Sequence, residues 1–291
     1  MPRHTSTASI ALALCAALNT VAVTPAMAHS VTLGDGHISA SPRAGYLMSC
    51  KTSFSRFGPG ASVDGPWIGD TTWDPSRKAV VDGSVTLPSR ISITLDGATR
   101  SVRANGLPGH PTGTYPISRS DDAFRYDRNP NAIRAGNIVL SLPAMPSIAA
   151  RPSCVPMGMI GFALSGAAIY NAVDERGRDA VAHEIQDACN GHPQQRGQYH
   201  YHSGSPCLTD TRSEAGGHSD LVGYALDGFG IYGARGENGR KLTNADLDAC
   251  HGHVHEVMWN GKRTAIYHYH TTDAYPYTIG CFTGTPVRAP R

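Results

Sequence analysis

The amino-acid sequence predicts a mainly β protein with a few short helices, in which two similar β-rich halves are related by a pseudo-two-fold axis and stapled by disulfides. Three observations lead to this fold class. Short runs alternate apolar and polar residues between Gly, Asn and Asp turns, a pattern typical of strands. A long segment occurs twice, and six cysteines remain once a predicted leader is removed, an even number typical of a disulfide framework.

The first 28 residues have the parts of a secretory signal peptide. Met1–His4 is a short basic stretch, residues 10–23 are mostly apolar, and Ala26-Met27-Ala28 is an A-x-A cleavage site. The apolar run is too short for a membrane span, and no other segment reaches about 18 apolar residues. We therefore expect cleavage after Ala28 and a secreted or periplasmic protein without a membrane span. A lipoprotein signal ending at Cys15 is disfavoured because bulky Leu14 stands where a small residue is needed.

Strand-like alternation marks an N-terminal β-rich region, which we place at residues 29–153. Three runs alternate and two turns lie beside them: Ser84–Leu87, Arg90–Leu95 and Asn137–Leu142, with turns at Asp96-Gly97 and Asn105-Gly106. We expect this region to pack on a duplicated domain at residues 154–287.

Two segments of the duplicated domain predict short helices. Asp179–Cys189 is the clearest candidate. Its counterpart is Asn244–Cys250, capped by Thr243 or by Asn244 itself. Both segments are short, so the domain is still expected to be mainly β.

The duplicated domain repeats histidine in a fixed pattern. Each copy of the tetrapeptide Tyr-His-Tyr-His follows an Asp-Ala-Cys-x-Gly-His segment. The copies are Tyr199–His202 after Asp187–His192, and Tyr267–His270 after Asp248–His253. Upstream, residues 160–170 match residues 222–232 at an offset of 62, whereas the tetrapeptides are offset by 68. The extra length falls in the second hairpin, and we predict repeats over about 159–207 and 221–282.

Turn chemistry predicts which histidines face each other in the second repeat. Asn260-Gly261 is a strong signal for a two-residue hairpin turn. Such a turn pairs Trp259 with Lys262 and, counting outward, His253 with His268 and His251 with His270. Paired side chains share one strand face, and the tyrosines alternate onto the other. Four imidazoles should therefore converge on one patch.

The first repeat predicts the same opposition through a different turn. A three-residue loop at Gln195–Gly197, with Gly197 in the left-handed region, pairs His192 with His200. Pro193 cannot donate to a strand ladder, so this strand should lie at a sheet edge or carry a bulge.

These motifs resemble the YHYH-domain family, which is named for its tetrapeptide. The resemblance runs from about Asn105 to Pro286 and is strongest after Met159. It supports the domain assignment and supplies no reaction, because the family is functionally uncharacterised. One departure is Ser165, where the second half has Asp227, so a carboxylate role at that position is not expected to repeat.

The repeat also predicts how the cysteines pair. Each half has one cysteine before its tetrapeptide and one after it, and a third pair remains: Cys189 with Cys207, Cys250 with Cys281, and Cys50 with Cys154. Each local bridge would close a loop around a histidine hairpin. Thiolate zinc ligands are the alternative, disfavoured by export and by the absence of CxxC spacing.

Clustered neutral imidazoles suit copper or zinc, and also iron or nickel, better than calcium or magnesium, which prefer oxygen ligands. Copper is our first expectation and zinc the alternative. The expected ligands are His192, His200, His202, His253, His268 and His270, followed by His110 and His251. Asp187, Asp227 and Asp248 are expected to orient rings through their second nitrogen.

Two further interpretations stay open. The histidines could form a hydrogen-bonded polar core without metal. In the opposite direction, cleavage after Ala28 would make His29 the N-terminus, an arrangement that resembles the histidine brace of copper oxygenases. The remaining histidines are expected at the surface or in hydrogen bonds: His37, His183, His218 and His255.

The sequence leaves three functions open. The first is a secreted metalloenzyme, either a copper oxidoreductase or a zinc hydrolase with Asp227 or a free histidine as base. The second is an extracellular or periplasmic protein that buffers or delivers copper or zinc without catalysis. The third is a structural module whose metal staples the fold. The formal charge of +2 and the lack of a basic run argue against a nucleic-acid partner. A small-molecule or polymer substrate and the oligomeric state are left open.

Overall fold

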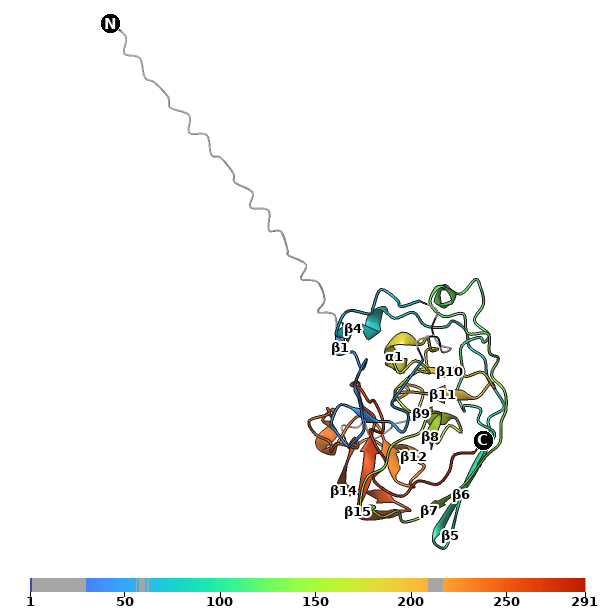
Figure 1. Ribbon diagram of the computed structural model, residues 1–291, viewed down its shortest axis with the longest axis vertical. Coiled ribbons are helices and arrows are strands. Elements are labelled where there is room, and N and C mark those ends of the chain that lie inside the picture. The colour runs from blue at the N-terminus through green and yellow to red at the C-terminus, as the bar shows by residue number, and fades with distance from the viewer. Residues whose placement is uncertain (2–29, 56, 58–60, 62, 209–216, 291) are drawn as a thin grey trace.

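The computed structural model describes Met1 and residues 30–290, except residue 56, residues 58–60, residue 62 and residues 209–216 (Figure 1). Apart from Met1, the predicted signal peptide lies outside the described residues, and so do Cys15 and His29. No described helix is long and apolar enough to cross a membrane.

An eight-stranded mixed sheet forms the centre of the fold, with the strand order β10-β11-β9-β8-β12-β13-β15-β14. The strands are β8 (Met159–Ala163), β9 (Ala168–Tyr170), β10 (Gly191–Pro193), β11 (Tyr199–Tyr201), β12 (Leu221–Ala225), β13 (Gly230–Tyr232), β14 (Gly252–Trp259) and β15 (Lys262–His270). From either edge inward the pairings are antiparallel, parallel and antiparallel, and the central pair is antiparallel. This confirms a mainly β fold; the pseudo-two-fold relation between the halves is compatible with the order and stays a prediction.

Two glycines allow the central strands to approach each other. A Cβ atom at Gly161 would lie 2.7 Å from the carbonyl oxygen of Tyr224, and one at Gly223 would lie 2.4 Å from that of Phe162. Any larger side chain would push β8 and β12 apart. The glycine of each matching segment therefore holds the middle of the sheet together.

The N-terminal region contributes a three-stranded antiparallel sheet of β5 (Ile91–Asp96), β6 (Thr99–Ala104) and β7 (Ile138–Pro143), which Figure 1 shows beside the lower end of the large sheet. The strands expected at Arg90–Leu95 and Asn137–Leu142 are confirmed, and each boundary lies one residue from the expected position. Ser84–Leu87 is not a strand and makes only the bridge from Val85 to Thr112.

Shorter elements complete the N-terminal region. In it, β1 (Val31–Thr32) pairs with β4 (Thr72–Trp73), and β2 (Ile38–Ser39) pairs with β3 (Leu47–Met48). The region also contains the 3-10 turns η1 (Pro75–Arg77) and η2 (Asp122–Arg125). A third 3-10 turn, η3 (Glu237–Gly239), lies outside this region and follows β13. The described core joins β6 and β7 to the large sheet, because Val102 and Leu140 are buried in one cluster with Phe162 and Tyr224. The N-terminal region is thus packed on the repeated one.

The helix predictions were largely wrong. Helix α1 covers only Ala180–His183, and no helix forms at Asn244–Cys250. The cause is a side chain that competes with the backbone. Asp187 Oδ1 accepts hydrogen bonds from the backbone N–H groups of Cys189 and Gly191, so the chain turns where a helix would continue. Asp248 Oδ1 accepts the corresponding two bonds in the second half.

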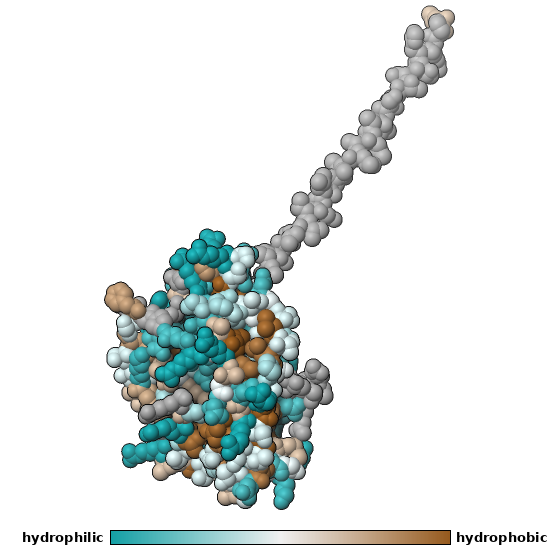
Figure 2. Space-filling model, turned by 90° about the vertical axis from the view of Figure 1, so that its right-hand side faces the viewer, coloured by the Kyte–Doolittle hydropathy of each residue, from teal (hydrophilic) through white to brown (hydrophobic). Residues whose placement is uncertain are grey.

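All three predicted disulfides are confirmed: Cys50–Cys154, Cys189–Cys207 and Cys250–Cys281. Cys189–Cys207 joins residues 18 positions apart and closes a loop around the first histidine hairpin. Cys250–Cys281 joins residues 31 positions apart and closes a loop around the second. A thiolate metal site at these cysteines is therefore excluded. Disulfides persist in oxidising compartments, so these bridges indicate such an environment. The surface face in Figure 2 mixes hydrophilic residues with separate hydrophobic patches.

Candidate metal centres

Both histidine hairpins have the predicted register. In the first, His192 pairs with His200, and Gly197 closes the loop with a φ of 86°. In the second, Trp259 pairs with Lys262 and His253 pairs with His268. Positive φ values at Asn260 and Gly261 match the expected turn. Pro193 is tolerated because β10 is the edge strand of the sheet.

The first group consists of Glu184, His192, His200 and His202. The Nε2 atoms of His200 and His202 lie 3.0 Å apart. Glu184 Oε2 lies 3.4 Å from His192 Nε2 and 3.2 Å from His202 Nε2. The three histidines are buried. Three buried imidazoles thus form a group that could hold a metal ion, and the carboxylate of Glu184 adjoins two of them.

Backbone carbonyls determine how these rings are protonated. His202 Nδ1 lies 2.5 Å from the carbonyl oxygen of Asn171, and His200 Nδ1 lies 3.2 Å from that of Gln198. A carbonyl only accepts, so each Nδ1 must donate and a neutral ring then carries a lone pair on Nε2. Two lone pairs 3.0 Å apart repel unless a proton or a metal ion lies between them. Neither ring nitrogen of His192 has a hydrogen-bond partner among the described residues.

Burial keeps His192 and His200 in the neutral form that binds metal. It lowers the pKa of His192 well below its usual value, and the neighbouring His200, His202 and Lys78 lower it further. The pKa of His200 is also well below its usual value, through burial and then through His202. Protons therefore compete weakly for these nitrogens near pH 7.

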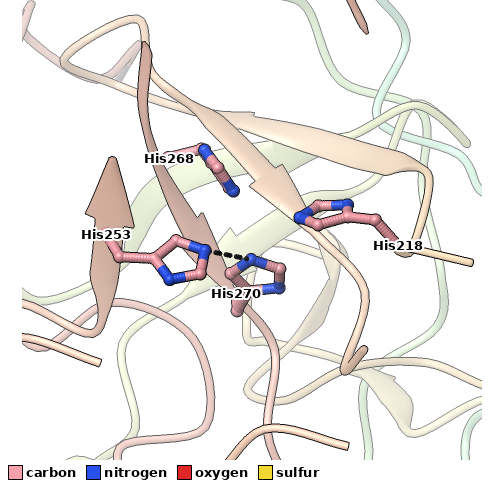
Figure 3. Close-up of side chains that lie close together, drawn as sticks. All are labelled: His218, His253, His268 and His270. Atoms are coloured by element: carbon pink, nitrogen blue, oxygen red, sulfur yellow. Dashed lines mark hydrogen bonds between the residues drawn. The ribbon is translucent and has the colours of Figure 1, made fainter. Parts of the chain in front are cut away.

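The second group consists of His218, His253, His268 and His270, whose rings converge in Figure 3. One nitrogen from each lies within 4.8 Å of the others. His253 Nε2 lies 3.1 Å from His270 Nε2. The side chains come from β14, β15 and the segment before β12 (Figure 3). Four imidazoles and no carboxylate make up this group.

The second group orients its rings in the same way as the first. His270 Nδ1 lies 2.6 Å from the carbonyl oxygen of Gly233, and His268 Nδ1 lies 3.0 Å from that of Ile266. These carbonyls occupy the repeat positions of Asn171 and Gln198, at the offsets of 62 and 68 residues. Burial lowers the pKa of His268 to about 3. The two groups share this ring orientation but differ in their fourth member, which is Glu184 in one and His218 in the other.

The second group adjoins a cleft. The cleft has a volume of about 670 Å³, and its lining includes His218, Tyr232, Glu237, His255 and Arg263. The ring of His255 stacks on His218 with centroids 5.0 Å apart. His255 Nε2 pairs with Glu237 Oε1. A side chain that can exchange protons thus stands beside the histidines at the cleft.

Two expected ligands lie outside both groups. His110 is on the tyrosine side of the sheet, where its Nε2 lies 2.5 Å from the hydroxyl of Tyr201. His251 bonds Thr272 Oγ1 through Nε2 at 3.1 Å. Its φ of 75° matches the 59° of Asn190 in the first half, so His251 ends the strand pairing and does not continue it. Three of the four imidazoles predicted to converge in the second hairpin do so.

The aspartates of the two Asp-Ala-Cys segments bond tyrosines and backbone groups. Asp187 accepts a 2.9 Å hydrogen bond from the hydroxyl of Tyr199, and Asp248 accepts a 3.0 Å hydrogen bond from the hydroxyl of Tyr267. Backbone carbonyls orient the histidine rings instead. The carboxylate of each repeat therefore anchors the first tyrosine of its tetrapeptide to the core.

Asp227 anchors a second tyrosine. Its Oδ2 accepts hydrogen bonds from the hydroxyl of Tyr269 and the backbone N–H of Gly284. In the first half the corresponding pair is Tyr201 with Ser165 Oγ, at 3.1 Å. As expected, the tyrosines pack on the face opposite the histidines. Asp227 is buried there, and burial raises its pKa.

Sequence reasoning missed the fourth member of each group. His218 was expected at the surface or in a hydrogen bond, and Glu184 was not considered as a ligand. Neither lies in a repeated motif, so no signal in the chain pointed to them. His183, expected to hydrogen-bond, does so with Asp35 and Asp64.

The fold and these two groups define a disulfide-bonded β protein with two histidine clusters that could each hold a metal ion. Residues 139–244 match the family model described as YHYH protein, which confirms the expected resemblance. The matched segment contains the whole first group and His218, and it ends before the second tetrapeptide. Comparison with curated proteins found no match, and comparison with solved structures found none.

Proposed function

We propose that this protein is an exported, histidine-rich metal-binding protein that acts outside the cytoplasm as a copper-dependent enzyme, with zinc as the alternative ion. The observation that carries the proposal is the pairing of bare Nε2 atoms. Two such atoms, on His200 and His202, lie 3.0 Å apart in the first group. In the second group the bare Nε2 of His270 lies 3.1 Å from His253 Nε2. Carbonyl groups already take the Nδ1 protons of His200, His202, His268 and His270. In the first group a cation between the two lone pairs removes their repulsion, and in the second it takes the place of the proton that His253 would otherwise share with His270.

The cleft favours catalysis over storage. A reacting molecule needs an open coordination position, and a cleft beside the metal provides access to one. Asp227 is a poor candidate for the base because Tyr269 and Gly284 engage its carboxylate on the other face of the sheet. His255 and its partner Glu237 stand beside the second group, so they are the better candidates to move a proton.

A second function is supported by a different observation. Both groups are built on equivalent hairpins, and neutral imidazoles at two places suit a protein that buffers or delivers copper or zinc without catalysis. The predicted signal peptide supports a secreted or periplasmic location for either function, as the disulfides do.

The metal content of the mature, exported protein tests the proposal. Elemental mass spectrometry without added metal or affinity tag should find a stoichiometric transition metal. Copper would support oxidative chemistry or metal handling, and zinc would support hydrolysis or a structural role. Absence of metal, together with failure to take up copper or zinc on titration, would mean that the histidines form a hydrogen-bonded core.

A further inference from the structure

We propose that the first group is a closed zinc site completed by Glu184, which stabilises the fold, and that the second group alone offers its metal to a small molecule. The inference rests on the proposed function, because both groups must hold metal. It goes further by giving each group a different ion environment and a different role.

The donor atoms of the first group fit a tetrahedral ion. Three separations are 3.0 Å between His200 and His202, 3.2 Å between Glu184 and His202, and 3.4 Å between Glu184 and His192. The remaining imidazole pairs lie within 4.8 Å. A tetrahedron of ligands at zinc–nitrogen and zinc–oxygen distances has edges of about 3.3 Å. The three imidazoles therefore surround a space of the right size, and Glu184 stands beside two of them as the fourth donor.

The carboxylate of Glu184 requires a cation. Its Oε2 atom is buried and has no hydrogen-bond partner among the described residues, and a buried carboxylate without a partner is costly. The nearby Lys78 acts on Glu184 only through a longer-range charge interaction, because its amine donates its hydrogen bonds to the carbonyl oxygen of Val181 and to Gln186. The other groups that face Glu184 are Asp127, whose carboxyl group adds negative charge, and the imidazoles of His192 and His202. A metal ion supplies the missing positive charge.

The ligand types favour zinc at this site. Three imidazoles and one carboxylate are common zinc ligands, whereas a hard carboxylate oxygen disfavours Cu(I). Four donors are the number that a tetrahedral ion takes, and the three histidines among them are buried. Closed sites of this kind are structural. This ion would tie the end of helix α1, through Glu184, to the β10–β11 hairpin.

The second group differs from the first in its ligand types and in its burial. No carboxylate is among its four members, and His218 and His253 are only half-buried. His218 also lines the 670 Å³ cleft. A small anionic or neutral donor entering this cleft can therefore reach a metal ion held by the imidazoles.

Chelator resistance tests the division. The full mature chain is loaded with zinc, dialysed against a chelator and analysed by elemental mass spectrometry. We expect one zinc ion to remain in the wild type and in Glu175→Gln, a matched surface control whose carboxylate pairs with exposed Lys51. Glu184→Gln should lose this ion and unfold at a lower temperature. Retention of the ion by Glu184→Gln would overturn the proposal.

A second measurement does not depend on whether Glu184→Gln folds. The wild type loaded with two cobalt ions is titrated with azide, and its visible spectrum is recorded. We expect azide to perturb one of the two cobalt centres, and His268→Ala to abolish that response. Perturbation of both centres, or chelator removal of both ions at one rate, overturns the division and leaves metal binding intact. Failure of both groups to bind metal overturns the proposed function as well.

Discussion

The hydroxyl of Tyr269 donates a 2.5 Å hydrogen bond to Asp227 Oδ2, on the face of β15 opposite the histidines. The matching tyrosine of the first half, Tyr201, meets the neutral hydroxyl of Ser165 at 3.1 Å. The side chains of each tetrapeptide thus have different roles on the two faces of its strand. Its tyrosines attach the strand to the core, and its histidines form the candidate metal groups.

Replacing Tyr269 by phenylalanine should destabilise the protein without removing metal. The buried Asp227 carboxylate would keep its bonds to Gly284 and Phe229 but lose its hydroxyl donor, at a cost of about 1.5–3 kcal/mol. Tyr201→Phe should cost about 1 kcal/mol, because its partners are neutral. Urea unfolding measures both costs. Metal loss in Tyr201→Phe would contradict the separation of the two faces.

Each group should lose metal independently. His200→Ala should weaken metal binding at the first group by more than about 100-fold, and His268→Ala should do so at the second, because each removes a ligand and not merely its support. His37→Ala is the matched control, since His37 stacks on Tyr46 away from both groups. Elemental analysis after dialysis gives the stoichiometry. Full metal content in both alanine variants would refute the two centres.

The effect of replacing His251 on stability should depend on how readily the new residue adopts the backbone conformation of this position. Its φ of 75° is a left-handed value that asparagine adopts readily and β-branched residues avoid. We expect His251→Asn to change the free energy of unfolding by less than about 1 kcal/mol and to keep both metals. His251→Val should cost at least about 1–2 kcal/mol. Loss of metal in His251→Asn, measured alongside stability, would instead assign His251 a role as ligand.

Asp127 should give the metal-free protein a defined pH dependence. Burial, and then the charge of Glu184, raises the pKa of Asp127 from 3.8 to about 6. The folded state therefore binds this proton more tightly than the unfolded state. The resulting stabilisation is fully present below pH 4 and is lost as the pH rises through 6.

Asp127→Asn has no proton to lose at this position. Its stability relative to the wild type should therefore rise by up to about 3 kcal/mol between pH 4 and pH 7. Urea unfolding of chelator-treated protein at several pH values measures the difference. A difference that stays constant with pH would show that the carboxyl group titrates normally.

Local chemistry explains which parts of the site could be predicted from sequence. Asn260-Gly261 and Gly197 define their turns, and counting outward from a turn gives the partner of each histidine. The disulfides followed from the position of each cysteine around its hairpin. The turns and the two local disulfides depend only on neighbouring residues, so the sequence contains enough information to predict them, and Cys50–Cys154 then follows as the remaining pair.

The features that failed depend on contacts between distant segments. The helix expected to run to Cys189 ends early because the Asp187 side chain bonds the backbone it would need. Glu184 reaches the first group only because the chain leaves the helix at that point. His218 precedes β12 and meets β15 only when the sheet has assembled. No periodicity or motif encodes either contact.

The spacing of the donors along the chain has a consequence for the order in which the protein matures. The members of the first group lie between residues 184 and 202, and those of the second lie between residues 218 and 270. Shorter loops close with a smaller entropy loss and form sooner. A newly exported chain could therefore capture an ion at the first group while its C-terminal strands are still unpaired. The second group exists only after β15 has joined β13, so its ion would enter a protein that is already folded.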